Sequence, residues 1–324
     1  MSSLKIGIIG GASIAERYLI PAIQELPEHF RLVGLASRTS ENAAYFSQKF
    51  RINTTVGYDE FLGKKNLDAV YIPLPTGLHY EWVKKSLKKG LHVLVEKSLA
   101  CSYQEVDELT TLAKERGLAL VENFQFRFHS QLQRINSLIK EQRIGELRCV
   151  RSAFGFPPFP DPDNIRYRKE LGGGALLDAG AYTIKISRMF LDDSCKVAGA
   201  SLYRDEEKGV DTWGGGFLKS GKEGLFSEIA FGFDHHYQCE LSLWGSKGKL
   251  TASRIFTAPP GFEPEIVLEN GKGKEVIKLE SDNHFKAMLR HFFEQCIKGG
   301  TDSEHQQNLS QAHLIESFIL KAAE

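Results

Sequence analysis

The sequence predicts an α/β protein in two parts: a doubly wound parallel sheet, then an α+β part with a largely antiparallel open sheet. Over residues 4–122, short apolar strand segments alternate with helical segments, as a parallel sheet with crossover helices requires. From about residue 195 to residue 280, strand follows strand, with turns such as Asn270-Gly271-Lys272 between them. We therefore expect one domain over residues 1–123 and a second over residues 124–324.

In the first half, each strand is a short apolar run and each helix has apolar residues at helical spacing. The best marked helix starts at Ser102, which has capping-box spacing to Glu105, and stops at Gly117. The predicted strands are 4–9, 31–36, 67–73, 91–95 and 118–122, and the predicted helices are 13–26, 40–50, 78–89 and 102–116.

The second half begins with a helix over 130–141 and a long strand over 147–156, followed by a Pro-rich loop over 157–163. Residues 175–191 have helical spacing, the region of successive strands follows, and helices over 284–298 and 305–323 close the chain.

Composition bounds the function. The chain has 324 residues, which suits two domains, and its 42% hydrophobic and 25% charged residues are ordinary for a globular protein. Lys and Arg together number 41, as do Asp and Glu, so the net charge is zero and nucleic acid is not an expected partner. An anionic ligand must therefore be held by a few placed groups.

The cysteines and the N-terminus point to the cytoplasm. The five cysteines are scattered without a CxxC pair, which is typical of reduced thiols and excludes the common zinc and redox motifs. His235-His236 has no carboxylate or cysteine partner at metal spacing, so we expect no metal. The apolar N-terminal run is too short for a signal peptide or a membrane span, so we expect no membrane partner.

A glycine loop follows the first strand and partly matches the G-x-G-x-x-G/A fingerprint of dinucleotide-binding Rossmann domains. Gly10 can make the tight turn and Ala15 can pack the helix against the sheet, but Ala12 replaces the middle glycine. Backbone amides at the helix start, Ser13 and Ile14, would receive phosphates. The alternative is a plain tight strand–helix turn.

The end of the second predicted strand favours NADP(H), with NAD(H) still possible. An acidic residue there would bind the adenosine ribose hydroxyl, but this chain has Ser37-Arg38-Thr39 and no carboxylate before Glu41. Arg38 can pair with a 2′-phosphate through charge-assisted hydrogen bonds. Alternatively, Arg38 only stacks on adenine.

Two further stretches carry candidate chemistry. Glu96-Lys97 follows the fourth predicted strand, at the edge where doubly wound sheets bind ligands; the alternative is a surface ion pair. After the triple glycine 172–174, Asp178, Tyr182 and Lys185 are spaced to share one helical face. That face is either a functional constellation or an exposed polar surface.

Taken together, these motifs resemble the glucose–fructose oxidoreductase/inositol dehydrogenase/MocA (Gfo/Idh/MocA) family. The similarity spans nearly the whole chain in order and is carried by the glycine loop, Pro73–His79, Glu96-Lys97, Glu122–His129 and Gly172–Tyr182. Within the family the sequence is most similar to nucleotide-sugar 3-ketoreductases, on the basis of Ala12, the insert Asp163–Tyr167, and Tyr182 where most members have histidine. It departs from the family pattern at Ser98, usually proline, and at Lys185, where many members have aspartate.

The resemblance implies catalytic roles. Lys97 would contact the reacting oxygen, Tyr182 would give it a proton, and Asp178 would orient the lysine or bind a substrate hydroxyl. A free phenol has a pKa near about 10, and an ammonium nearby, from Lys97 or Lys185, would bring it closer to neutral. His79 would lie near the nicotinamide side of the cofactor.

The resemblance also implies binding residues, for which structural salt bridges are the alternative at each arginine. The expected cofactor-binding residues are Gly10, Ala12, Ser13, Ile14, Ser37, Arg38, Pro75, Thr76, His79, Glu96, Lys97 and Asn123. The expected substrate-binding residues are Arg127, Arg166, Tyr167, Arg168 and Lys185.

The leading hypothesis is an NADP(H)-dependent oxidoreductase that reduces the C3 keto group of a nucleotide-linked deoxyhexose. Alternatives are an NAD-dependent dehydrogenase of a nucleotide amino sugar or polyol, an NAD-dependent glycosidase, and a non-catalytic cofactor sensor. By analogy with the family, the open sheet of the second domain pairs subunits, and we expect a homo-oligomer, dimer or tetramer.

Overall fold

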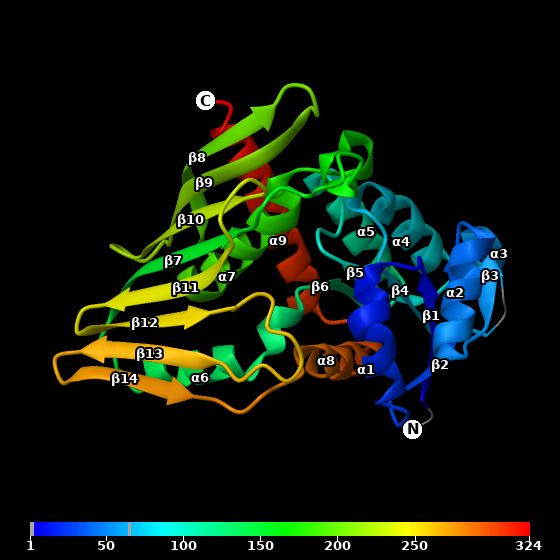
Figure 1. The fold of residues 1–324 in the computed structure, drawn as a ribbon, viewed down its shortest axis with the longest axis horizontal. Coiled ribbons are helices and arrows are strands. Elements are labelled where there is room, and N and C mark those ends of the chain that lie inside the picture. The colour runs from blue at the N-terminus through cyan, green and yellow to red at the C-terminus, as the bar shows by residue number, and fades with distance from the viewer. Residues whose placement is uncertain (1–2, 64–65) are drawn as a thin grey trace. The chain divides into compact units, whose positions relative to one another are not determined.

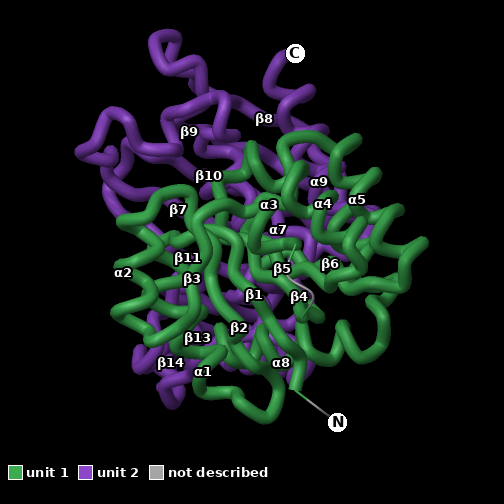
Figure 2. The backbone as a smooth tube through the Cα atoms, turned by 90° about the vertical axis from the view of Figure 1, so that its right-hand side faces the viewer, with its two compact units in different colours: residues 1–123, 285–309 green, residues 124–284, 310–324 purple. Residues whose placement is uncertain are grey.

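The computed structural model describes residues 3–63 and 66–324, which form two compact units. Unit 1 contains Met1–Asn123 and Phe285–Leu309, and unit 2 contains Phe124–His284 and Ser310–Glu324 (Figure 2). The chain therefore passes between the units three times, whereas the sequence analysis placed one boundary, after residue 123.

Unit 1 is built on a parallel sheet with the strand order β3-β2-β1-β4-β5-β6, so the predicted doubly wound fold is confirmed (Figure 1). The strands are β1 (Leu4–Ile9), β2 (Phe30–Ser37), β3 (Thr54–Val56), β4 (Ala69–Ile72), β5 (His92–Glu96) and β6 (Leu120–Asn123). The sequence analysis missed the edge strand β3, because its three residues give too short a pattern.

Two helices of unit 1 begin at a side-chain cap that the sequence supplies. The Ser102 hydroxyl accepts a hydrogen bond from the Glu105 amide at 3.3 Å, and the Thr39 hydroxyl accepts one from the Asn42 amide at 3.2 Å. The helices are α1 (Ile20–Gln24), α2 (Ser40–Phe50), α3 (Tyr58–Leu62), α4 (His79–Lys88), α5 (Tyr103–Glu115), α8 (His284–Lys298) and the first part of α9 (Asp302–Lys321). A π-helical turn, Ala15–Leu19, precedes α1 and lies inside the predicted helix 13–26.

Unit 2 is built on an eight-stranded sheet with the order β14-β13-β12-β11-β7-β10-β9-β8 (Figure 1). Every neighbouring pair is antiparallel except β7 and β10, which run parallel, so the predicted antiparallel character holds for most of the sheet. The strands are β7 (Leu147–Gly155), β8 (Lys196–Asp205), β9 (Val210–Lys219), β10 (Phe226–Gly232), β11 (Gln238–Gly245), β12 (Gly248–Ser253), β13 (Glu265–Asn270) and β14 (Gly273–Lys278).

Helices α6 (Ser130–Lys140) and α7 (Ala181–Leu191) bury their apolar sides in the same core as the inward side chains of this sheet. Alternate strand residues point to the opposite face, which leaves Phe217 and Trp244 40% and 53% exposed. The predicted helix 175–191 is not a uniform α-helix, because it starts with a π-helical turn, Leu176–Gly180.

Candidate active site

In unit 1, the glycine loop follows β1 and leaves no room for side chains at its first two positions. Gly10 has φ +117°, and a Cβ there would lie 2.6 Å from Leu74 Cδ2. A Cβ on Gly11 would lie 2.6 Å from Asn42 Nδ2. Helical backbone starts at Ser13, directly after the partly exposed Ala12. The loop thus brings backbone amides to the carboxyl end of β1, next to the loop after β4, which is where doubly wound sheets take their ligands.

The end of β2 presents an arginine to solvent. Ser37 is buried, and its carbonyl accepts a hydrogen bond from the Gly57 amide at 2.8 Å. The next residue, Arg38, is exposed, and residues 37–40 contain no carboxylate. This edge can therefore pair with a phosphate, and it offers no acceptor for a ribose hydroxyl of the kind that an aspartate provides.

At the ends of β5 and β6, a polar network lies beside Lys97. The Glu96 carboxylate accepts hydrogen bonds from the Tyr71 hydroxyl at 2.7 Å and from Asn123 Nδ2 at 2.6 Å. Burial raises the pKa of Glu96, while these two hydrogen bonds oppose that rise. Lys97 is partly exposed, and its peptide bond to Ser98 is cis. Tyr71 was not singled out from the sequence, because it reads as one more apolar residue of a buried strand.

His79 is fully buried at the start of α4, and both of its ring nitrogens face backbone carbonyls. Nδ1 lies 2.7 Å from the carbonyl oxygen of Ser98, and Nε2 lies 2.7 Å from that of Leu74. Burial lowers the pKa of His79 to about 4, so the ring is neutral near pH 7 and carries one N–H. Its predicted place beside the nicotinamide stays a prediction, and its ring lies between the backbone carbonyls of two loops.

In unit 2, Asp178 and Arg166 form an ion pair. Arg166 Nε donates to Asp178 Oδ2 at 2.5 Å, and the guanidinium carbon lies 4.7 Å from the centroid of the Phe159 ring. The neighbouring carboxylate raises the pKa of Arg166 above its usual value. Asp178 lies in the π-helical turn, so its carboxylate is directed to the insert before the triple glycine. The sequence analysis named both residues but did not pair them.

The triple glycine packs directly on that insert. The amide of Gly173 donates to the Arg168 carbonyl at 3.0 Å and that of Gly174 to the Arg166 carbonyl at 2.9 Å. A Cβ on Gly174, which has φ +118°, would lie 2.5 Å from Asp211 Oδ1. Asp211 Oδ2 in turn accepts from the Leu176 amide at 2.6 Å, and burial raises the pKa of Asp211. Asp211 was missed, because nothing in an isolated strand acid indicates a contact 35 residues away.

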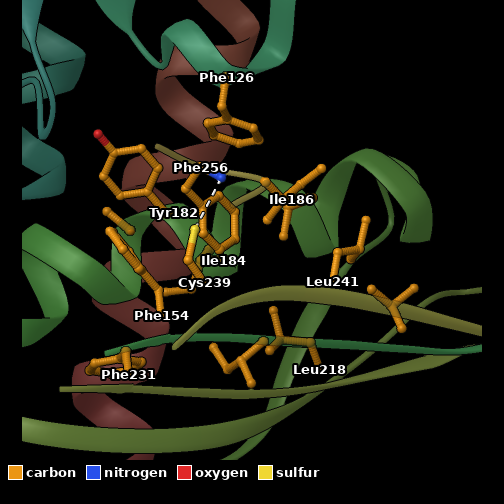
Figure 3. Packing of buried hydrophobic residues seen from close by; sticks show 14 of the residues in the cluster. Phe126, Phe154, Tyr182, Ile184, Ile186, Leu218, Phe231, Cys239, Leu241 and Phe256 are labelled. Carbon is orange, nitrogen blue, oxygen red and sulfur yellow. Dashed lines mark hydrogen bonds between the residues drawn. The ribbon is translucent and has the colours of Figure 1, made fainter. Parts of the chain in front are cut away.

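Tyr182 stands in an aromatic cluster of unit 2. Its ring centroid lies 5.3–5.7 Å from those of Phe124, Phe126, Phe154 and Phe256. Figure 3 shows the hydroxyl at the margin of the labelled residues, pointing away from them. The phenol is therefore held by apolar rings on its sides while its oxygen points away from them, an arrangement suited to a positioned proton donor.

Lys185 is fully buried one turn after Tyr182, with its Nζ 5.2 Å from the centroid of the Phe124 ring. Tyr182 is 7% exposed. The alternative of an exposed polar face on this helix is therefore wrong: the helix buries both polar side chains against aromatic rings. The apolar residues of the surrounding strands and loops supply this cover, which helix periodicity alone does not reveal.

The other predicted substrate residues lie in less specialised surroundings. Tyr167 is buried, and its hydroxyl accepts from the Phe159 amide at 3.0 Å. Arg168 is exposed and pairs with Glu170 at 2.6 Å, while Arg127 lies over the Phe128 ring. Their roles toward a substrate stay predictions.

Within unit 1 the structure brings together Glu96 and Asn123, and within unit 2 it brings together Arg166 with Asp178 and Tyr182 with Lys185 around Phe124. Lys97 belongs to unit 1 and Tyr182 to unit 2, and their joint action stays a prediction.

Within residues 3–63 and 66–324, no three His, Cys, Asp or Glu side chains gather closely enough to hold a metal ion. His235-His236 is exposed in the turn between β10 and β11. None of the helices in the described part of the chain is long and apolar enough to cross a bilayer.

A doubly wound sheet with a glycine loop, followed by a unit with an open sheet, is typical of nicotinamide-dependent oxidoreductases. Residues 4–124 match the profile described as "Oxidoreductase family, NAD-binding Rossmann fold", and residues 132–251 match that of the "GFO/IDH/MocA C-terminal domain". The chain belongs to the Gfo/Idh/MocA family of oxidoreductases.

Relatives and solved structures are similar over the whole chain. A dTDP-3,4-didehydro-2,6-dideoxy-α-D-glucose 3-reductase of Saccharopolyspora spinosa is 36% identical over 97% of this chain and 96% of the relative. The enzyme of that name from Streptomyces antibioticus is 36% identical over 98% and 97%. The crystal structure of KijD10, a 3-ketoreductase from Actinomadura kijaniata in complex with NADP and TDP-benzene, superposes with a TM-score of 0.94, at 33% identity and 98% coverage of both chains.

Proposed function

We propose that this enzyme uses NADPH to reduce the C3 keto group of a nucleotide-linked deoxyhexose. The observation that carries the proposal is the similarity, over nearly the full length of both chains, to reductases of a dTDP-linked 3,4-didehydro-2,6-dideoxyglucose. The local structure fits, because Tyr182 is held in an aromatic cluster with its hydroxyl pointing away from the other rings.

The residues of unit 1 fit a dinucleotide with a 2′-phosphate. Gly10 and Gly11 allow the backbone to turn tightly, and the helix that starts at Ser13 offers amides to the pyrophosphate. The exposed Arg38, with no carboxylate beside it, would hold the 2′-phosphate. We expect Pro75, Thr76 and the network around Glu96 and Asn123 to line the nicotinamide end. When bound, the cofactor would supply a hydride to the carbonyl carbon.

The chain itself would handle the proton. In the proposed reaction the Tyr182 hydroxyl gives its proton to the ketone oxygen, which becomes the new hydroxyl, and solvent then restores the phenol. The Lys97 ammonium would donate a hydrogen bond to the same oxygen and stabilise the developing negative charge. Arg127, Arg166 and Arg168 are candidates for the diphosphate, with Arg166 already oriented by Asp178.

We also propose a homo-oligomer formed through the open face of the unit 2 sheet, and a cytoplasmic location. The open face carries the exposed side chains Phe217 and Trp244, which a second copy would cover. All five cysteines are free thiols, as expected in a reducing compartment.

The proposal is tested by following NADPH oxidation with a synthetic dTDP-linked 3-keto-2,6-dideoxyhexose. The parent should turn over, and Tyr182→Phe and Lys97→Ala should each lower kcat by about 10² to 10⁴-fold. Tyr203→Phe, an exposed tyrosine on β8 whose ring stacks on Trp213, is the matched control and should keep full activity. Full activity in a Lys97→Ala/Tyr182→Phe double variant would disprove the catalytic assignment. Oxidation of a nucleotide amino sugar with NAD⁺, or release of sugar from an aryl glycoside without net cofactor turnover, would replace the proposed reaction.

A further inference from the structure

We infer that His79 is a positioning residue that sets the backbone of the Lys97 loop and thereby the place of the Lys97 ammonium. This inference rests on the proposed role of Lys97. His79 is the first residue of α4, and its ring reaches the backbone directly after Lys97, because Nδ1 lies 2.7 Å from the Ser98 carbonyl oxygen.

The same ring ties a second loop to the first. Nε2 lies 2.7 Å from the carbonyl oxygen of Leu74, directly before Pro75 and Thr76. One side chain therefore lies within hydrogen-bond distance of both the loop after β4, expected at the cofactor, and the loop after β5, which carries Lys97. Its ring is 0% exposed, so water does not compete for either carbonyl.

A second hydrogen bond fixes the backbone of the Lys97 loop. The Leu99 amide donates to the Glu122 carboxylate at 2.8 Å. The Ser98 carbonyl and the Leu99 amide, which belong to the same peptide unit, are thus held from α4 by His79 and from β6 by Glu122. A side chain on a partly exposed loop gains a defined position when its own backbone is fixed in this way.

Neutral imidazole has one N–H, so only one of the two carbonyls receives a proton at a time. Two substitutions separate them. In His79→Asn the amide nitrogen falls near the place of Nδ1 and can still donate to Ser98. In His79→Gln it falls near the place of Nε2 and can donate only to Leu74. Both variants are polar, uncharged and similar in size.

We expect His79→Gln to lower kcat by about 10²-fold, with little change in the KM of the sugar, and His79→Asn, which keeps a donor to the Ser98 carbonyl, to recover most of that loss. Equal loss in both variants, or a loss confined to KM, overturns the inference. Val83→Ala, a buried substitution in the same helix, is the control for lost stability and should leave kcat unchanged.

A double-mutant cycle shows whether His79 acts through Lys97. In the Lys97→Ala background, His79→Gln should have no further effect on kcat, because the group it positions is gone. If the two losses multiply, His79 acts independently of Lys97 and the inference is wrong, while the proposed function stands. If Lys97→Ala alone keeps full activity, the role of Lys97 fails and the inference fails with it.

Discussion

Arg166 Nε and Asp178 Oδ2 lie 2.5 Å apart, which joins the insert before the triple glycine to the helix that carries Tyr182. The two residues are 12 positions apart in the chain, and the link between them is reinforced by the hydrogen bonds of Gly174 to the Arg166 carbonyl in the insert and of Gly173 to the Arg168 carbonyl just after it. A candidate diphosphate-binding cation and the candidate proton donor therefore belong to one locally rigid element of unit 2.

Removal of this ion pair should affect stability and substrate binding together. For Asp178→Ala we expect the free energy of unfolding to fall by about 1–2 kcal/mol, a value between those of exposed and buried pairs, because the Arg166 side chain is 35% exposed. The KM of the nucleotide sugar should rise, because Arg166 loses its orientation. Glu170→Ala breaks the solvent-exposed pair with Arg168 and should change neither quantity measurably. Urea unfolding and steady-state kinetics measure both, and equal effects in the two variants would contradict the prediction.

Cofactor choice should depend on Arg38. Arg38→Ala should lower kcat/KM for NADPH by about 10-fold to 100-fold and leave that for NADH nearly unchanged, because only NADPH carries the 2′-phosphate. Arg31→Ala, an exposed arginine near the start of the same strand, is the control. If Arg38→Ala weakens both cofactors equally, Arg38 stacks on adenine and does not read the phosphate.

A methyl group at Gly174 should be costly. Gly174→Ala would place Cβ 2.5 Å from Asp211 Oδ1 at a backbone φ of +118°, so the free energy of unfolding should fall by about 1–3 kcal/mol. Gly271→Ala in the turn between β13 and β14 has no heavy atom within 4 Å of the added Cβ and should be nearly neutral. Thermal unfolding of the two variants checks the difference, and a neutral Gly174→Ala would refute this reading of the loop.

The buried His79 should make the protein less stable in acid. Its pKa is about 4 in the folded protein and about 6.5 when unfolded, so below pH 6.5 the unfolded chain takes up a proton that the folded one does not. Stability is therefore lost as the pH falls from 6.5 towards 4, by about 2 kcal/mol at pH 5 from this group. In His79→Asn the drop in unfolding free energy between pH 7 and pH 5 should shrink by that amount. Val83→Ala should lower stability equally at both pH values, and an unchanged drop in His79→Asn would rule out the effect.

The open face of the unit 2 sheet should mediate self-association. Light scattering after size exclusion should give two or four times the chain mass of 36.3 kDa. Trp244→Glu places a charge among exposed apolar side chains and should shift the protein to smaller species. Leu320→Glu, on the 64% exposed Leu320 of α9, should not. A monomeric parent would remove the proposed oligomer.

The sequence predicted most of the fold because its local signals are strong and agree with one another. Ser102 and Glu105 mark the start of α5 and Gly117 its end, and the strands of unit 1 are short buried runs between such helices. The strand β3 was not predicted, because its three residues are too few to show the alternation of buried and exposed side chains that marks a strand. The two π-helical turns also escaped, because a single wide turn scarcely changes the apolar spacing of a helix.

The candidate site was predicted residue by residue but not as an arrangement. Motifs single out Lys97, Asp178 and Tyr182 as candidates, because of their residue types and their positions after strands and glycines. They do not indicate that Asp178 pairs with Arg166, that Lys185 is buried, or that Asp211 holds the start of the helix. Each of these depends on which distant segments the folded chain brings together.

Unit 1 is discontinuous in sequence, and this affects how the protein can be made. Residues 285–309 belong to it, and they stack Phe285 on Tyr18 at 4.6 Å and Phe292 on Phe30 at 6.3 Å between ring centroids. During synthesis the ribosome delivers the N-terminal strands long before these helices, so the core of unit 1 stays incomplete until residues 285–309 have emerged. A fragment ending at residue 123 would lack the ring contacts of Tyr18 and Phe30, and folding of this unit is thus tied to the synthesis of residues 285–309.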